Sequence, residues 1–566
     1  MQKDWHIKDA DPQLQTKLSG ALDVHPIVAQ LLINRAIVNV KEAQDFLKAD
    51  LAGLHDPFLL KNMDVAVERI RLAQLRKERV LVFGDYDVDG VTSSALLNNI
   101  LTQMGIEVLH YIPHRMHHGY GLNEEVSGFV CEHKVSLLIA VDCGITACHE
   151  VGLLRQQGVD VIIIDHHHPS EILPEATAII DPKQKDCPYP FKHLAAVGLV
   201  VKLAQALLGG ISEEALNLAA IGTVADVVPL QGENRILVKS GLASLVNTKN
   251  KGLMALLETA RIKDKKITPF HVGFILGPRI NAAGRMDTAS KSLDLFLSDD
   301  AAKAYDLAKA LERHNTERQK MQGSIVEEAI EIVEREVNFK DQKVIVVSKQ
   351  GWHKGVLGIV ASKIVDRYYR PTVVISIDED GIGTASARSI DGFHLHRALQ
   401  SCADYLEAFG GHEGAAGLTI REENIDPFRN LINELAHEML EAKRLIPTLR
   451  IDCEIPLASI SMGLAGIIDS MEPFGEGNPA PIFCSRHLSV KRTPLILGKD
   501  TLKLWVSDGD FTISAVGFNM ARYQGMLRPG EKIDLAYQII IDEWNKEPTP
   551  QLKLKDIRMS AGIRPS

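Results

Sequence analysis

The sequence predicts an α/β fold class with four parts: a doubly wound parallel sheet domain, a long connector helix, a second and smaller α/β domain, and a C-terminal all-β, OB-like domain. Three observations support this prediction. Short, uniformly apolar runs alternate with helical segments between residues 65 and 230, as buried parallel strands do. A long charged segment with helical spacing follows them. From residue 446 onward, short β-rich runs are separated by turns.

The sheet domain is expected to follow an N-terminal helical segment. Residues 1–55 begin with a polar stretch, and HPIVAQLLINRAI then spaces its apolar residues as a helix does. The sheet domain is expected over 56–298, with 230–297 mainly helical. Its predicted strands are VLVF (80–83), EVLHYI (107–112), SLLIAV (136–141), DVIIID (160–165) and TAII (177–180).

The second half of the chain changes character twice. Residues 299–337 are charged on most faces, which is typical of a helix that connects two domains. A smaller α/β domain is expected over 338–435, where the helix VLGIVASKIVDRYY separates the strands KVIVVS and PTVVISI, and where FGGHEGAAGL (409–418) forms a glycine-rich turn. The predicted strands of the β domain, 440–566, are LRIDCEI, LKLWVS, FTISAVGF, KIDLAYQIIID and QLKLKDIRM.

The composition narrows the classes of function. The formal net charge of -10 argues against a broad basic surface, so any nucleic-acid contact must come from local clusters. The 7 cysteines contain no CxxC pair, which argues against zinc fingers and a disulfide framework and fits a reducing cytosol. No apolar run reaches the roughly 18 residues that a membrane span needs. A soluble, cytoplasmic protein is therefore expected, and a monomer is taken as the default because nothing in the sequence decides the oligomeric state.

The stretch GDYDVDG places Asp85, Asp87 and Asp89 directly after an apolar strand. Carboxylates this close repel one another, and a metal ion is the simplest compensating charge. The pattern D-x-D-x-D-G also begins a calcium-binding EF-hand loop. That alternative fails because position twelve is Leu96 instead of glutamate, and because a strand precedes the motif where an EF-hand has a helix.

Other polar residues are expected to meet these aspartates at one edge of the sheet. Asp142 and Asp165 follow the next strands, His166 and His167 follow Asp165, and Asp226 follows a helix. The carboxyl ends of parallel strands line one crevice, so the side chains converge. Oxygen and imidazole ligands suit Mn²⁺ or Mg²⁺, and their number indicates two ions roughly 3.5–4 Å apart.

Ordinary structural roles are weighed against this interpretation. A single aspartate after a strand is usually a turn or helix-capping residue, which is the preferred reading for Asp142 taken alone. Asp89 either binds metal or caps the helix that begins near Val91. His168 is expected beside the ligands or on the surface.

The motifs GDYDVDG, VDCG, DHHH and VADVVPL resemble, in this order, the motifs of the DHH phosphoesterase superfamily. GPRINAAGR (277–285), GWHKGVLGIVASKI (351–364), TASARS (384–389) and GGHEGAAG (410–417) extend the resemblance to its bacterial single-strand-specific DNA exonucleases. The resemblance covers nearly the whole chain and implies a DHH-type sheet domain and a DHHA1-type second domain. Glu413 departs from the pattern, which often has a smaller residue there.

The resemblance implies a metal-dependent 5′→3′ exonuclease that releases 5′-mononucleotides from single-stranded DNA during repair and recombination. It implies Mn²⁺ or Mg²⁺ as cofactor, in two sites bridged by Asp142. It also implies single-strand-binding protein and a RecQ-type helicase as partners. The catalytic and metal-binding set carried over by motif is Asp85, Asp87, Asp142, Asp165, His166, His167 and Asp226.

Residues outside the metal set are expected to hold DNA. GPRINAAGR is interpreted as a loop whose arginines grip phosphate or pair with acidic neighbours. The resemblance implies that TASARS holds the region of the 5′-terminal phosphate, and the backbone amides of the glycine-rich turn are a further candidate contact for an anion. The substrate-binding residues expected in this way are Arg115, Arg279, Asn281, Arg285, Ser386, Arg388, Ser389 and His412. Phe474, Trp505, Phe511 and Phe518 of the β domain either stack on bases or form its core, and RHLSVKR (486–492) and RIKDKK (261–266) are basic patches.

Two alternative functions remain open at this point. Smaller relatives in the superfamily hydrolyse short oligoribonucleotides, cyclic dinucleotides or pyrophosphate, but they lack the β domain that favours a long polymer here. A eukaryotic replication factor of the superfamily has kept the fold as a DNA-bound scaffold without catalysis. Such a protein is expected to have lost metal ligands, whereas this sequence keeps the whole set.

Overall fold

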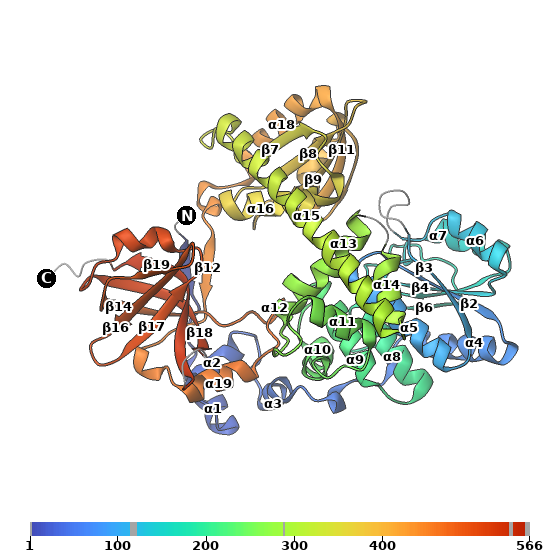
Figure 1. The fold of residues 1–566 in the computed structure, drawn as a ribbon, viewed down its shortest axis with the longest axis horizontal. Coiled ribbons are helices and arrows are strands. Elements are labelled where there is room, and N and C mark those ends of the chain that lie inside the picture. Colours follow the sequence, from blue (N-terminus) through green and yellow to red (C-terminus); the bar gives the residue numbers. More distant parts are fainter. Residues whose placement is uncertain (1–2, 114–120, 287–288, 543–546, 561–566) are drawn as a thin grey trace.

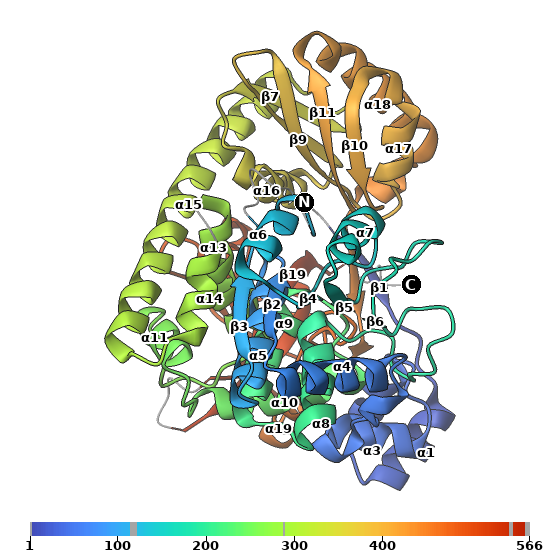
Figure 2. The same cartoon turned by 90° about the vertical axis from the view of Figure 1, so that its right-hand side faces the viewer.

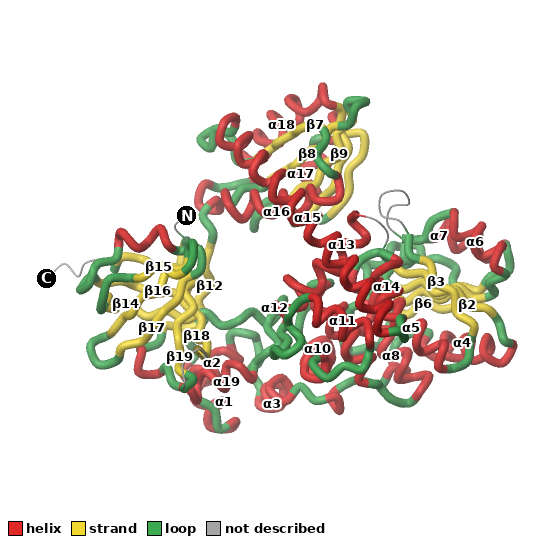
Figure 3. The backbone as a smooth tube through the Cα atoms, in the orientation of Figure 1, coloured by secondary structure: helices red, strands yellow, loops and turns green. Residues whose placement is uncertain are grey.

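The computed structural model describes residues 3–113, 121–286, 289–542 and 547–560. Figure 1 shows the sheet domain on one side, a β-barrel on the other, and the smaller α/β domain above them. The long helix α15 (Ala301–Glu336) runs from the sheet domain to the smaller α/β domain. The strands gather in these three bodies (Figure 3). The predicted fold class is confirmed, while the exact domain boundaries stay predictions.

The sheet domain contains every strand that the apolar runs predict. The strands are β2 (Arg79–Gly84), β3 (Glu107–Tyr111), β4 (Leu137–Val141), β5 (Asp160–Ile164) and β6 (Ala178–Ile180). They pair in parallel in the order β3-β2-β4-β5-β6, which Figure 2 shows from left to right. Successive side chains of a strand point to opposite faces, so Val80 and Val82 join one apolar cluster, and Leu81 and Phe83 join another.

Helices cover both faces of this sheet, as a doubly wound fold requires. The helices in and after the sheet are α4 (Met63–Arg76), α5 (Val88–Gln103), α6 (Glu125–His133), α7 (Cys148–Gln156), α8 (Ala196–Leu208), α9 (Glu213–Ala225), α10 (Gly232–Leu245), α11 (Lys251–Thr259), α12 (Pro269–His271), α13 (Gly277–Met286) and α14 (Ser290–Leu297). A π-helical segment, η3 (Val272–Leu276), joins α12 to α13. No helix of the described residues has the length and apolar character to cross a membrane.

The smaller α/β domain is a mixed sheet with helices. Its strands are β7 (Ile345–Gln350), β8 (Thr372–Ile377), β9 (Ile382–Arg388), β10 (Leu406–Gly411) and β11 (Ala415–Arg421), in the order β10-β11-β9-β8-β7. Its helices are α16 (Leu357–Tyr368), α17 (Leu395–Ser401) and α18 (Ile425–Met439). The predicted glycine-rich turn is smaller than expected, because most of FGGHEGAAGL pairs as the hairpin β10–β11.

The C-terminal strands form the expected OB-like barrel. They are β13 (Cys453–Glu454), β14 (Phe483–Val490), β15 (Leu495–Leu497), β16 (Thr501–Ser507), β17 (Thr512–Gly517), β18 (Lys532–Asp542) and β19 (Thr549–Met559). The strands β14, β18, β19, β17 and β16 follow one another, and a further pairing of β14 with β16 closes the barrel. Helix α19 (Met462–Ser470) lies against β18 and β19.

The N-terminal segment differs in part from the expected run of helices. Besides α1 (Pro12–Leu22), α2 (Pro26–Ile33) and α3 (Val40–Lys48), it contains the strand β1 (Asp4–Ile7). This strand pairs in parallel with β12 (Thr448–Ile451), which lies in the last quarter of the sequence. Because the pairing partner is so distant, local periodicity gave no sign of it. Val28, Leu31 and Leu32 of α2 join the core of the barrel.

Candidate active site

The predicted aspartates meet where the winding of the sheet reverses. The connection that leaves β2 goes to β3 on one side, and the connection that leaves β4 goes to β5 on the other side. In such sheets the binding crevice lies at the carboxyl ends of the two strands where the connections diverge, here β2 and β4. Asp85 follows β2, Asp142 follows β4 and Asp165 follows β5. All three side chains are buried. The shared sheet edge therefore brings together residues that are far apart in the sequence.

The GDYDVDG stretch is a tight turn that leads from β2 into α5. Asp87 caps α5, because its Oδ1 accepts hydrogen bonds from the backbone N–H groups of Asp89 (2.8 Å) and Gly90 (3.1 Å). A Cβ on Gly90 would lie 2.5 Å from the carbonyl oxygen of Asp85, so only glycine allows the backbone to fold back this closely. The turn thus holds Asp85 and Asp87 at the same edge.

Asp89 caps a helix, but a different one from the helix that was expected. Its two carboxylate oxygens accept hydrogen bonds from Ala196 (2.7 Å) and Val197 (3.0 Å), at the start of α8. Burial and the neighbouring Asp87 raise the pKa of Asp89 to about 7. Of the two alternatives for Asp89, the cap of its own helix is excluded because Asp87 occupies that position. The metal-binding alternative stays a prediction, since Asp89 lies in one group with His166 and Asp226.

Asp165 orients the imidazole ring of His167. Its Oδ1 accepts hydrogen bonds from the backbone N–H groups of His166 (2.8 Å) and His167 (3.2 Å) and from Nδ1 of His167 (2.7 Å). Its Oδ2 accepts a hydrogen bond from Ile145 (3.0 Å). This pattern places the proton of His167 on Nδ1 and the lone pair on Nε2, as in carboxylate–histidine–metal arrangements. His168 is exposed.

Asp142, His166 and Asp226 form the centre of the site. Nε2 of His166 lies 3.2 Å from Oδ1 of Asp142 and 3.6 Å from Oδ2 of Asp226, which follows α9. Asp142 and Val227 both have a left-handed backbone with φ of 62°. For a β-branched residue such as Val227 this conformation is strained, and such strain is common where a functional side chain must be aimed.

The side chains can hold divalent metal ions. Three overlapping groups each bring their ligand atoms within 4.8 Å of one another: Asp85 with Asp87 and Asp142, Asp142 with His166 and His167, and Asp89 with His166 and Asp226. His166 is buried, and neither of its ring nitrogens has a hydrogen-bond partner among the described residues. The same is true of the Oδ2 atom of Asp226. Buried polar atoms of this kind fit ligands of a metal, and mixed oxygen and imidazole donors suit Mn²⁺ or Mg²⁺.

The electrostatics of the site lead to the same conclusion. Burial and the surrounding carboxylates raise the pKa of Asp142 well above its usual value and that of Asp226 to about 9. Burial lowers the pKa of His166 to about 3, which keeps the imidazole neutral, as a metal ligand must be. The carboxylates cannot all ionise together without a compensating cation.

One residue of the sheet edge was missed by the sequence analysis. Asp181 follows β6, is fully buried, and accepts a hydrogen bond from the backbone of Lys183 (2.6 Å). Burial raises its pKa to about 7. The amino group of Lys183 in turn donates to the carbonyl oxygen of His166. The rule that found Asp142 and Asp165 also applies to Asp181, because it directly follows the predicted strand TAII.

The predicted DNA-binding residues of GPRINAAGR lie on a helix, so the interpretation as a loop was wrong. Pro278 is at the second position of α13, where proline is compatible with a helix. Arg279 forms a salt bridge with Glu312 of α15 (2.5 Å), while Nη1 of Arg285 donates to the carbonyl oxygen of Gly355 (2.8 Å) in the smaller α/β domain. Asn281 is half-buried. These arginines join parts of the protein beside the metal site.

The residues expected near the terminal phosphate are divided between a strand and two turns. Ser386 and Arg388 lie on one face of β9, and Nη1 of Arg388 donates to Oγ of Ser386 (3.1 Å). The hydroxyl of Ser389 donates to the carbonyl oxygen of Phe393 (2.6 Å), which is a structural contact. His412 is exposed in the turn of the β10–β11 hairpin. Arg115 lies outside the described residues.

The aromatic residues of the barrel have mixed environments. Phe474 packs against the barrel core, as the structural alternative predicts. The guanidinium of Arg492 stacks on the ring of Trp505, 3.8 Å from the ring centroid. Phe511 and Phe518 are 50% and 55% exposed. In the basic patches, Arg486 pairs with Glu454 and Lys266 pairs with Asp469 and Glu472, so part of their charge is neutralised within the protein.

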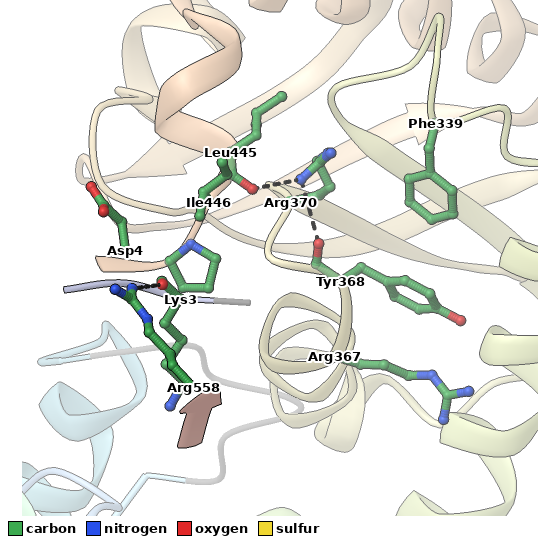
Figure 4. Close-up of a pocket in the computed structure, with 10 residues that line it drawn as sticks. Lys3, Asp4, Phe339, Arg367, Tyr368, Arg370, Leu445, Ile446 and Arg558 are labelled. Carbon is green, nitrogen blue, oxygen red and sulfur yellow. Dashed lines mark hydrogen bonds between the residues drawn. The ribbon is translucent and has the colours of Figure 1, made fainter. Parts of the chain in front are cut away.

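A basic cavity of about 790 Å³ lies away from the metal clusters, where β1, α16 and β19 approach one another. Figure 4 shows Arg370 donating to the carbonyl oxygens of Leu445 and Tyr368, and Arg558 donating to that of Lys3. These arginines bind backbone from neighbouring segments. The cavity therefore lies where the smaller α/β domain, the N-terminal strand and the barrel meet.

Comparison with known proteins identifies relatives over the whole chain. The family described as "DHH family, N-terminal domain" matches residues 79–223, the DHHA1 domain matches 341–438, and the RecJ OB domain matches 451–556. The single-stranded-DNA-specific exonuclease RecJ of Bacillus subtilis is 40% identical over 98% of this chain and 71% of its own length. The RecJ of Haemophilus influenzae is 33% identical over 94% of this chain and 96% of its own length.

Solved structures agree with these relatives. The crystal structure of Thermus thermophilus RecJ in complex with Mn²⁺ has a TM-score of 0.83 at 29% identity, covering 99% of this chain and 81% of that one. The complex of the same protein with Mg²⁺ has a TM-score of 0.78 at 28% identity, covering 99% of this chain and 79% of that one. The similarity therefore includes the arrangement of all the domains.

Proposed function

Because this chain belongs to the family of single-stranded-DNA-specific RecJ exonucleases, we propose that it hydrolyses single-stranded DNA from the 5′ end to 5′-mononucleotides, using two divalent metal ions. The protein is a hydrolase of the DHH family that depends on a divalent metal, Mn²⁺ or Mg²⁺. The direction of degradation, the number of ions and the role of each residue are the proposal.

The observation that carries the proposal is the overlap of the ligand groups. Asp142 belongs both to the group with Asp85 and Asp87 and to the group with His166 and His167. A shared carboxylate between two adjacent groups is what a pair of bridged ions requires. We therefore assign Asp142 as the bridging residue, with Asp226 beside His166. The scaffold alternative has no support here, since Asp85, Asp87, Asp142, His166, His167 and Asp226 all fall within the three groups, while Asp165 orients His167.

The residues of the site have different proposed roles in catalysis and binding. The residues of this set would hold the metal ions, which would supply Lewis-acid chemistry and activate water for phosphodiester hydrolysis. His166 stays neutral because it is buried, and Asp165 orients His167 through its Nδ1 proton. Asp89 holds the start of α8 beside the ligands. Arg279, Asn281 and Arg285 on α13, and Ser386, Arg388 and His412 in the smaller α/β domain, are proposed to contact the DNA backbone, as is Arg115.

Changing Asp165 to asparagine tests its orienting role. The amide keeps the size of the side chain, but its oxygen is a weaker acceptor than the carboxylate for the N–H group at Nδ1 of His167. We therefore expect Mn²⁺ affinity to fall about 10- to 100-fold. Isothermal titration calorimetry with Mn²⁺ measures the change. His168→Ala serves as the control, because His168 is exposed beside the same turn. Unchanged affinity in the Asp165 variant would show that the hydrogen bond does not position the ligand.

Strands labelled at one end test the function itself. Purified protein is incubated with single-stranded DNA labelled at the 5′ or the 3′ end, in Mn²⁺, Mg²⁺ or EDTA. We expect the 5′ label to leave at once as a mononucleotide, the 3′-labelled strand to shorten stepwise, and EDTA to stop both reactions. Immediate release of the 3′ label would reverse the proposed direction. Binding without hydrolysis in either metal would favour a scaffold.

The biological setting is also part of the proposal. The family resemblance supports a role in DNA repair and recombination, in contact with single-strand-binding protein and a RecQ-type helicase. All 7 cysteines are free, which supports a reducing, cytoplasmic location. Co-purification of the tagged protein from cells, with and without nuclease treatment, distinguishes direct partners from proteins that share its DNA.

A further inference from the structure

Two phenylalanines form an exposed aromatic stack that the assigned site does not use. Phe270 of α12 and Phe274 of η3 have ring centroids 5.0 Å apart and planes inclined by 27°. Phe270 is 61% exposed and Phe274 is 72% exposed. Large aromatic side chains normally bury most of their area, so a stacked pair left in solvent indicates a binding surface.

The stack lies close to the metal site. Three residues after Phe274, Gly277 faces the end of α9 and the start of α5, which adjoin Asp226 and Asp87. A Cβ on Gly277 would lie 3.8 Å from Ala225, which precedes Asp226, and 3.9 Å from Val88, which follows Asp87. The segment η3 itself contacts α9, whose last residue precedes Asp226, so Phe274 is carried by a helix that packs beside a ligand. The π-helical backbone of η3 is also a feature that is frequent at functional sites.

The segment that leads into the stack is attached to the barrel domain. Lys266 lies just before α12, and its amino group forms salt bridges with Asp469 (2.8 Å) and Glu472 (2.9 Å), at the end of α19 and just beyond it. This attachment fixes the start of α12 against the barrel domain. In Figure 1, α12 projects from the sheet domain toward the barrel. The segment that carries the two rings therefore lies on the part of the sheet domain that faces the barrel.

We propose that Phe270 and Phe274 form a stacking platform for the bases of the single strand as it enters the metal site. Every base has a flat aromatic face, so such a platform holds a strand without selecting its sequence. A paired base has its faces covered by its neighbours in the duplex, so the platform also favours single strands. The inference rests on the proposed function, because it takes single-stranded DNA as the substrate.

Strands that lack bases test the platform. Release of the first nucleotide is measured under single-turnover conditions with a normal strand and with a strand that is abasic at nucleotides two to four. We expect Phe274→Ala to weaken the apparent affinity for the normal strand about tenfold and to leave the abasic strand unaffected. The maximal rate should change little, because the metal ligands are intact. Phe274→Trp should retain the affinity.

Matched controls separate stacking from a loss of structure. Phe58→Ala removes a similarly exposed phenylalanine, 53% exposed, from the N-terminal half of the chain, and it should bind both strands like the wild type. Equal weakening of both strands in Phe274→Ala, or no weakening at all, overturns the proposal. Quenching of 2-aminopurine at the third nucleotide reports stacking in Ca²⁺ without hydrolysis. Its loss in Phe274→Ala supports the platform even if the wild type fails to cut, and unchanged quenching overturns it.

Discussion

Replacing Asp142 by asparagine is expected to lower the rate of DNA hydrolysis at least about a thousandfold. Asp142 lies between the two ligand groups, so removing its charge affects both proposed metal sites. Asparagine has the same shape and tolerates the left-handed backbone that Asp142 adopts, with φ of 62°, so the fold should persist. The rate is measured by release of a 5′-labelled nucleotide, and bound manganese is measured by mass spectrometry.

The matched control for this experiment is His168→Ala. His168 ends the DHHH motif but is exposed, so this variant should retain nearly full activity and metal content. Circular dichroism and thermal melting confirm that both variants are folded. An Asp142→Asn protein that binds two equivalents of manganese and cuts at the normal rate would contradict the assignment of Asp142 as the bridging ligand.

Replacing Lys202 by methionine is expected to destabilise the sheet domain by about 3–5 kcal/mol. Lys202 and Glu233 form a salt bridge of 2.6 Å with side chains 0% and 1% exposed. Glu233 also accepts hydrogen bonds from the hydroxyl of Tyr189 (2.6 Å) and the backbone of His55 (2.9 Å). Without Lys202, the carboxylate of Glu233 would remain buried without its compensating charge. Urea unfolding followed by circular dichroism measures the loss.

Two further variants give this prediction its controls. Glu407→Gln breaks a salt bridge with Arg421 in which both side chains are about half exposed, so it should cost at most about 1 kcal/mol. Adding Glu233→Leu to Lys202→Met removes the buried, unpaired carboxylate of Glu233 and should recover part of the lost free energy of unfolding. A Lys202→Met protein as stable as the Glu407 variant would show that the buried pair contributes little.

The sequence alone determined the features that depend on local patterns, namely the strands of the sheet domain and the aspartates that follow them. The strands of the sheet domain are buried on both faces, so continuous apolar runs marked them, and each of the five predicted runs contains a strand. Aspartates directly after these strands then had to share one edge, because parallel strands end on the same side. The convergence of Asp85, Asp142 and His166 follows from this rule.

Tertiary structure decided what depends on distant contacts. Asp89 caps α8, more than a hundred residues away, because α8 packs on α5. The strand β1 exists because β12, in the last quarter of the chain, pairs with it. GPRINAAGR is helical because α13 packs between the metal-site loops and α15, which no short motif reveals. Local patterns report the backbone's own preferences, whereas caps, pairings and exposed aromatic surfaces depend on which segments meet after folding.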